Sequence, residues 1–164
     1  MDKFVWYVAG PFDHRPQVRE IIAKIQAAGW STNSRWAAED NEDIAPDDPL
    51  REDKLRFQAT RDVEDVLMAD GLIYVNSKKS DGKATELGLS IATLKPIVII
   101  GDRENNIFLN LNIPAFPTVE EMLTWLDADG QYYLKFVQAK QLEYINETQM
   151  EDAGVLGQME FPSE

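Results

Sequence analysis

The chain has 164 residues, of which 44% are hydrophobic, and its formal net charge is −13. This size predicts one globular domain, and no apolar run reaches the roughly 18 residues that span a bilayer. The negative charge argues against sequence-independent electrostatic binding to polymeric DNA or RNA, whose phosphates require a basic surface. With no cysteine and one histidine, the chain cannot form disulfides or thiolate zinc sites, and we expect neither a metal nor a cofactor. A secretory leader pattern is also missing, so we expect a cytoplasmic protein.

The first third of the chain alternates between short apolar runs and amphipathic segments. Residues 4–9 form a continuous apolar run, which predicts a buried parallel strand ended by a Gly-Pro pair. A helix is predicted between Pro16 and Gly29, because its apolar residues recur on one face. A more polar second strand is predicted over 30–36. The acidic, proline-containing stretch 37–49 predicts a long loop that can act as a lid.

The alternation continues through the middle of the chain. A helix is predicted over 50–68. Its expected inner side consists of Leu55, Ala59, Val63, Val66 and Leu67. A strand over 72–76, a helix over 81–94 and a strand over 97–100 follow, and Thr118 opens a helix with a capping box. Alternating strands and helices predict an α/β fold with three layers, in which a parallel sheet of order 2-1-3-4-5 is covered by helices.

The end of the chain departs from this alternation. Residues 1–130 are expected to form the α/β domain, and 131–149 an added C-terminal helix. One face of that helix is expected to carry Tyr133, Phe136, Val137, Lys140 and Tyr144. Residues 150–164 are polar and acidic, which predicts a disordered tail.

A sheet of this order changes direction between its first and third strands, so the crevice at their carboxyl ends is the expected binding site. The turn after the first strand brings Tyr7, Gly10, Pro11 and Phe12 to that crevice. Gly10 allows a ligand to approach the backbone closely. The structural alternative is that the Gly-Pro pair merely ends the strand.

Acidic residues reach the same crevice from two helices. Asp62 lies eight residues before Asp70, about 12 Å along a helix, which places it near the upper edge of the sheet. Asp81, Gly82 and Glu86 occupy the loop and first turns of the next helix. Asp62 could instead be solvated and Asp81 could be a helix cap, whereas Glu86 stands among apolar positions and is the strongest candidate for a buried acid.

Trp36 and Arg15 could each have a functional or a structural role. Trp36 precedes the acidic stretch 39–53 and could stack on a base, although core packing is the commoner use of tryptophan. Arg15 could meet a 5'-phosphate or be an ordinary surface cation. Glu64 and Asp65 are expected on the outer face of their helix or lower down.

The order and spacing of these motifs resemble the nucleoside 2-deoxyribosyltransferase-like family, which includes deoxyribosyltransferases and 2'-deoxynucleoside 5'-monophosphate N-glycosidases. The resemblance covers residues 4–126 and rests on the turn 9–12, on Asp62 with 69–70, and on the motif 81–88. It implies a flavodoxin-like fold and cleavage or transfer at the N-glycosidic bond of 2'-deoxynucleosides or their monophosphates. It also implies a homo-oligomer.

Carried over residue by residue, the resemblance implies that Glu86 is the catalytic nucleophile, that Asp62 and Asp81 orient the sugar or the base, and that Tyr7 is an active-site tyrosine. A carboxylate stabilises an oxocarbenium-like centre and can form a covalent sugar ester with it. Family members often complete the site with a polar residue of a neighbouring subunit. The candidates here are Asn105, Asn106, Asn110 and Asn112.

Two functions of different class follow from the sequence. The first is a nucleotide-metabolism enzyme, a transferase or hydrolase, that uses Glu86 on a small-molecule nucleoside or nucleotide. The second is a non-catalytic nucleotide-binding module that uses Gly10, Asp62 and Asp81 in the same crevice. A flavin or dinucleotide protein is disfavoured, because the turn after the first strand lacks a G-x-G-x-x-G motif. Neither a membrane nor polymeric nucleic acid is an expected partner.

Overall fold

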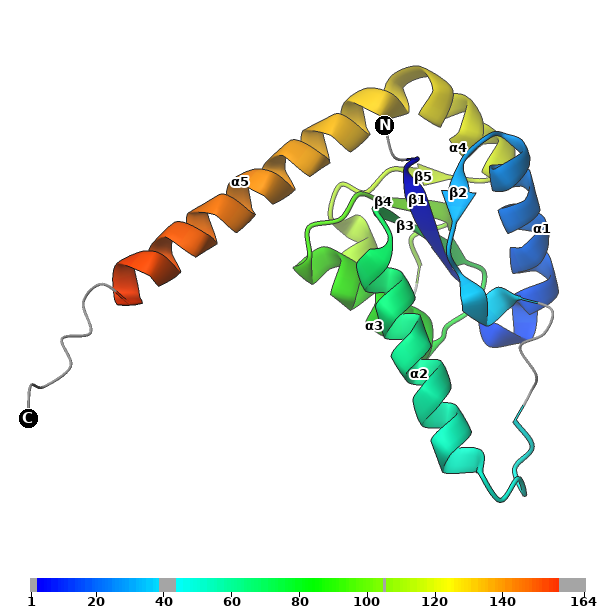
Figure 1. The fold of residues 1–164 in the computed structure, drawn as a ribbon. Coiled ribbons are helices and arrows are strands. Elements are labelled where there is room, and N and C mark those ends of the chain that lie inside the picture. Colours follow the sequence, from blue (N-terminus) through cyan, green and yellow to red (C-terminus); the bar gives the residue numbers. More distant parts are fainter. Residues whose placement is uncertain (1–2, 39–43, 105, 157–164) are drawn as a thin grey trace, which may run out of the picture.

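The computed structural model describes residues 3–38, 44–104 and 106–156. Its centre is a five-stranded sheet with every pair of neighbouring strands parallel, in the order β2-β1-β3-β4-β5 (Figure 1). The strands are β1 (Val5–Ala9), β2 (Ser31–Thr32), β3 (Gly71–Asn76), β4 (Ile97–Gly101) and β5 (Ala115–Phe116). The predicted sheet order and the flavodoxin-like fold are confirmed.

Helices cover both faces of this sheet. They are α1 (Arg15–Ala27), α2 (Arg51–Met68), α3 (Asp81–Ala92) and α4 (Val119–Trp125), and α5 (Gln131–Leu156) follows them. Helices α1 and α4 contact each other on one face, and α2 and α3 contact each other on the opposite one (Figure 1). The predicted capping box is present, because Thr118 Oγ1 accepts a hydrogen bond from the Glu121 amide at 3.2 Å.

The three central strands form the core. Parallel strands with helices on both sides are buried on both faces, which explains their continuous apolar runs. The largest fully buried strand side chains are Trp6, Tyr7, Leu72, Ile73 and Ile99. Each aliphatic member contributes about 1.5–3 kcal/mol by leaving water. The position of Tyr7 in this rigid core determines where its hydroxyl lies at the sheet edge.

The second strand is much shorter than the predicted 30–36. The backbone pairs with β1 only at Ser31 and Thr32, and a 3₁₀ helix, η2 (Arg35–Ala37), follows. The reason is that a side chain takes the place of a backbone acceptor. Ser34 Oγ accepts a hydrogen bond from the Val8 amide at 2.6 Å. Because a hydroxyl satisfies this amide, the chain is free to turn away from the sheet.

The prediction of which α2 residues face the sheet is largely wrong. Only Val66 of the five residues is buried, while Leu55, Val63 and Leu67 remain 38%, 40% and 48% exposed. Ala59 is exposed as well. The first turns of α2 extend beyond the sheet (Figure 1), so most of the apolar side chains that were expected to contact the domain are exposed among the described residues.

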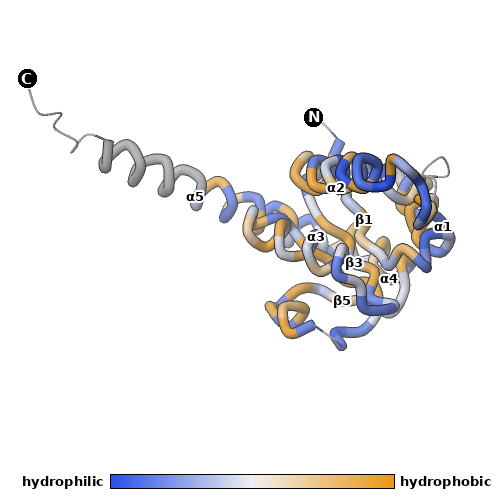
Figure 2. Tube along the Cα trace, turned by 90° about the horizontal axis from the view of Figure 1, so that it is seen from below, coloured by the Kyte–Doolittle hydropathy of each residue, from blue (hydrophilic) through white to orange (hydrophobic). Residues whose placement is uncertain are grey.

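Helix α5 leaves the domain as a long projection (Figure 2). The Tyr133 hydroxyl ties its first turns to β4 by accepting from the Ile97 amide at 3.1 Å and donating to the Ile97 carbonyl at 2.9 Å. The helix continues past the expected end at 149, and residues 157–164 of the expected tail lie outside the described residues. None of the helices in the described part of the chain is long and apolar enough to cross a membrane.

Candidate active site

The side chain of Tyr7, from β1, meets that of Glu86, from α3. The Tyr7 hydroxyl donates a hydrogen bond to Glu86 Oε1 at 2.5 Å. Burial, followed by the charge of Glu86, raises the pKa of Tyr7 far above its usual value, so the hydroxyl keeps its proton at any physiological pH. Tyr7 is therefore a permanent donor that orients the Glu86 carboxyl group and leaves its second oxygen available.

The carboxyl group of Glu86 titrates near neutrality. Its pKa is raised to about 7, chiefly by burial and to a smaller extent by the negative charge of Asp62. The hydrogen bond from Tyr7 and the positive charge of Lys83 act in the opposite direction. A carboxylate that is incompletely solvated and ionised at neutral pH is suited to attack an electron-poor carbon.

Asp62 is a second acid with an upward-shifted pKa, and its charge acts on Glu86. Burial, with the charge of Asp65, raises the pKa of Asp62 to about 6, while Arg61 and Arg35 lower it. Its charge acts on both Glu86 and Tyr7. The structure therefore brings Asp62 and Glu86 together from α2 and α3, although they are 24 positions apart in the sequence.

Asp81 and Gly82 begin α3 beside this pair. The cap is Ser80, whose Oγ accepts from the Lys83 amide at 3.4 Å, so Asp81 is not the capping residue. Asp81 is exposed and lines a pocket of about 190 Å³. The other residues of that pocket are Tyr74, Asn76, Lys79, Ser80, Ala84 and Asn106. The catalytic role of Asp81 and the substrate contact of Gly82 stay predictions.

The turn after β1 is shaped by packing. A Cβ atom on Gly10 would lie 2.5 Å from Val18 Cγ2 and 3.5 Å from the Trp36 ring, so glycine allows α1 to approach the strand. Pro11 is buried, and Phe12 is 47% exposed with the Arg15 guanidinium 4.7 Å from its ring centre. The turn therefore leaves the Phe12 ring at the surface beside Arg15, and the contacts of Pro11 and Phe12 with substrate stay predictions.

Trp36 is buried in the core above Gly10. Its indole Nε1 donates to the Val8 carbonyl at 2.9 Å, which satisfies its polar atom within the protein. This is the packing role that sequence analysis held as the alternative to stacking on a base. A contact between Trp36 and substrate stays a prediction.

We expect Gly10→Ala to lower the free energy of unfolding by about 1–3 kcal/mol, because the new methyl group must displace the buried Val18 side chain. Gly82→Ala is the matched control for stability, since the nearest atom to its Cβ is Ser80 Oγ at 3.9 Å. Chemical denaturation of both variants measures this difference. An equal loss of stability in both would contradict the packing role of Gly10.

Two loops are tied together along the rim. His14 Nδ1 and Ser77 Oγ are hydrogen-bonded at 2.8 Å, and Lys78 forms an ion pair with Asp13. These contacts join the loop after β1 to the loop after β3. They hold the carboxyl ends of β1 and β3 in a defined relation.

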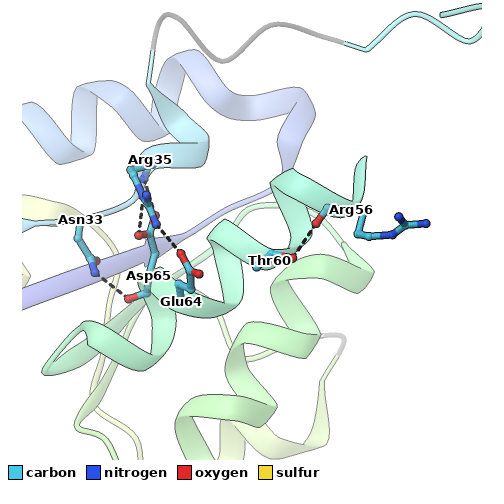
Figure 3. A network of polar contacts seen from close by, with 6 residues as sticks. All are labelled: Asn33, Arg35, Arg56, Thr60, Glu64 and Asp65. Carbon is cyan, nitrogen blue, oxygen red and sulfur yellow. Dashed lines mark hydrogen bonds and ion pairs between the residues drawn. The ribbon is translucent and has the colours of Figure 1, made fainter. Parts of the chain in front are cut away.

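Asp65 was expected on the outer face of α2 or lower down, and the outer face is wrong because Asp65 is buried. Figure 3 shows its contacts. Its carboxylate accepts from Arg35 Nε at 2.7 Å and from the Arg35 amide at 3.1 Å. Asn33 Nδ2 donates to the Asp65 carbonyl at 2.7 Å. Glu64 does lie outward and reaches Arg35 only at 3.4 Å. The buried contacts anchor the last turns of α2, and thereby Asp62, to the domain.

Replacing Asp65 with alanine is expected to cost about 2 kcal/mol of stability, because the substitution removes the buried carboxylate that accepts from the Arg35 side chain and amide. Glu64→Ala on the same helix is expected to stay within about 0.5 kcal/mol, since its ion pair is exposed. Thermal and urea unfolding test the pair. Similar losses in the two variants would refute the anchoring role.

Sequence reasoning also missed Lys83 and Tyr74. Lys83 is only 1% exposed, and its Nζ lies 4.4 Å from the centre of the Tyr74 ring. The available signal for Lys83 was its spacing, because a lysine three positions before the nucleophile candidate lies on the same helix face. Among the asparagine candidates, Asn106 lines the pocket and bonds to Tyr74, whereas Asn105 lies outside the described residues.

The structure describes only part of the acidic stretch 39–53. Asp48 accepts a hydrogen bond from the Leu50 amide at 2.8 Å and an ion-pair contact from Lys54 at 2.5 Å, so it helps to begin α2. Residues 39–43, which belong to the predicted lid, lie outside the described residues. The lid stays a prediction.

No protein-family model and no curated protein sequence matches this chain. Among solved structures, it is similar to a conserved protein from Enterococcus faecalis V583, with a TM-score of 0.54 and 18% identity over 75% of this chain and 96% of that chain. A 2-deoxyribosyltransferase from Bacillus psychrosaccharolyticus matches with a TM-score of 0.49 and 18% identity, over 73% of this chain and 90% of that one. A CMP N-glycosidase from Clostridium botulinum matches with a TM-score of 0.48 and 18% identity, over 75% and 98%. What the Enterococcus protein and this chain share is the fold.

Proposed function

We propose that this protein cleaves the N-glycosidic bond of a 2'-deoxynucleoside or its 5'-monophosphate, with Glu86 as nucleophile. The observation that carries the proposal is the Glu86 carboxyl group, which is held by the Tyr7 hydroxyl at 2.5 Å and has a pKa raised to about 7. The family implied by the sequence motifs, the nucleoside 2-deoxyribosyltransferase-like proteins, uses a glutamate at this position.

The chemistry follows from the arrangement of the two acids. Glu86 attacks C1' of the sugar, a C–O bond forms, and the C–N bond to the base breaks with its electron pair leaving on the base. A proton delivered to the base makes it a better leaving group, and Asp62, whose pKa is raised to about 6, is suited to orient or protonate it. The sugar ester then reacts with a second base, which is transfer, or with water, which is hydrolysis.

The test is product analysis with the four common deoxynucleosides and their 5'-monophosphates, each with and without a second free base. Release of free base, or exchange for the second base, is expected for at least one substrate. A requirement for the second base would identify a transferase, and a requirement for phosphate would identify a nucleotide enzyme. Ligand binding without turnover across the whole panel would overturn the proposal in favour of the binding module.

We also propose that the protein is a homo-oligomer. The exposed apolar side chains of α2 support this, because they would leave water in a symmetric contact between subunits. They are Leu55, Phe57, Val63, Leu67 and Met68. Light scattering after size exclusion is expected to give a multiple of 18.6 kDa.

Phe57→Glu is expected to shift that mass toward the monomer, because it places a charge in the contact. Tyr132→Glu is the matched control, since Tyr132 is an exposed aromatic residue on α5. A parent protein of monomer mass would contradict the oligomer, and a parent oligomer that Phe57→Glu leaves intact would contradict the α2 contact.

A further inference from the structure

Lys83 is a buried cation whose three hydrogen-bond acceptors are all uncharged. Its Nζ donates to the Val75 carbonyl at 3.1 Å, to Asn76 Oδ1 at 3.1 Å and to the Lys78 carbonyl at 2.7 Å. Its side chain is 1% exposed. Burying an ammonium group is costly unless it is bonded, and these acceptors use all three of its protons. The positive charge itself is not cancelled by a bonded carboxylate.

The contacts of Lys83 organise the edge of the sheet next to Glu86. The acceptors Val75 and Asn76 end β3, and Lys78 belongs to the loop that leads into α3. Asn76 extends the network, because its Nδ2 donates to the Asp102 carbonyl at 2.9 Å and to the Glu104 carbonyl at 3.0 Å. One lysine thus joins α3, the end of β3 and, through Asn76, the loop after β4.

Lys83 stands three positions before Glu86 on α3, so both side chains lie on the same face of the helix. The ionisable groups that act on Glu86 are Tyr7 from β1, Asp62 from α2 and Lys83 from its own helix. Those that act on Lys83 include Glu86 and, from the loop after β4, Asp102. Because Asp62 opposes ionisation of Glu86, Lys83 is the positive charge that offsets it.

We propose that Lys83 is a positioning residue for Glu86: its ammonium clamps the end of β3 and the following loop against α3, and its charge favours the ionised carboxylate of Glu86. The consequence for catalysis rests on the proposed function, whereas the effect on Glu86 does not. Burial lowers the pKa of Lys83 to about 8, so the ammonium is predominantly charged at neutral pH, where the effect is needed.

The experiment is a carbon NMR titration of glutamate side-chain carboxyl groups, with the Glu86 signal assigned by its loss in Glu86→Gln. Parent protein, Lys83→Met and Lys95→Met are compared. Lys95 is the matched control, because its Nζ also donates to backbone carbonyls, those of Leu67 and Ala69, but its charged neighbour is Asp70. The Glu86 titration is expected to move to higher pH by about half a pH unit or more in Lys83→Met and to stay in place in Lys95→Met.

Kinetics separates a charge effect from a loss of structure. In Lys83→Met, kcat/KM is expected to fall about threefold or more below neutral pH and to recover in part on the alkaline side, because the acid limb has moved. A uniform loss at every pH with an unmoved Glu86 titration would overturn the proposal. A parent without turnover would refute the proposed function alone, since the NMR titration still reports on Lys83.

Lys83→Gln provides a second variant, which keeps hydrogen-bond donors while removing the charge. A folded Lys83→Gln with a shifted Glu86 titration supports the proposal even where Lys83→Met does not fold. Failure of both variants to fold would overturn the charge role and leave Lys83 as a purely structural residue.

Discussion

Glu86→Gln is expected to lower kcat/KM by about a thousandfold or more, because an amide cannot form the sugar ester. The substitution preserves the shape of the side chain and an oxygen that accepts the hydrogen bond from Tyr7. Initial rates of base release with the best substrate measure the effect. Glu64→Gln is the matched control, since Glu64 is an exposed glutamate on α2. Activity within tenfold of the parent would rule out Glu86 as the nucleophile.

The same variant is expected to be more stable than the parent at alkaline pH. Folding raises the pKa of Glu86 from 4.5 to about 7, so the folded state holds a proton that the unfolded state releases between these values. Its ionisation therefore destabilises the folded protein as pH rises through this window. Allowing for partial exposure, Glu86→Gln should gain about 1–2 kcal/mol at pH 8 and almost nothing near pH 4.5. Urea unfolding at both values tests this, and a gain of equal size at both would contradict it.

Asp62→Asn is expected to lower kcat by about a hundredfold, because the leaving base loses an acid that orients or protonates it. The pH dependence should change as well. The negative charge of Asp62 raises the pKa of Glu86, so its removal lets Glu86 ionise at lower pH and moves the acid limb of kcat/KM downward. In the parent, the acid limb is expected near pH 7, where Glu86 ionises.

The direction of this shift distinguishes Asp62 from Lys83. Loss of a negative neighbour and loss of a positive neighbour must move the ionisation of Glu86 in opposite directions. A pH–rate series on the two variants and the parent measures both. An acid limb that moves upward, or remains in place, in Asp62→Asn would contradict the placement of its charge beside Glu86.

Local patterns in the sequence were sufficient to predict the parallel sheet and its order. The apolar runs at 4–9, 72–76 and 97–100 are long enough to reveal strands buried on both faces, and each crossover has room for one helix. The second strand was mispredicted because no local pattern shows that Ser34 Oγ takes a position in the ladder. The inner side of α2 was mispredicted for a related reason. Periodicity identifies an apolar face and does not say what covers it.

The sequence by itself determined the identity of the acids and the edge of the sheet where they gather, because strand order and helix rise place Asp62 and Glu86 at the carboxyl ends of β1 and β3. Only the tertiary structure decided how readily these acids ionise. The pKa of Glu86 depends on burial, on the Tyr7 hydroxyl from β1 and on the opposing charges of Asp62 and Lys83. Desolvation and Coulomb interactions depend on distances in space between groups far apart in the chain, and those distances exist only after folding.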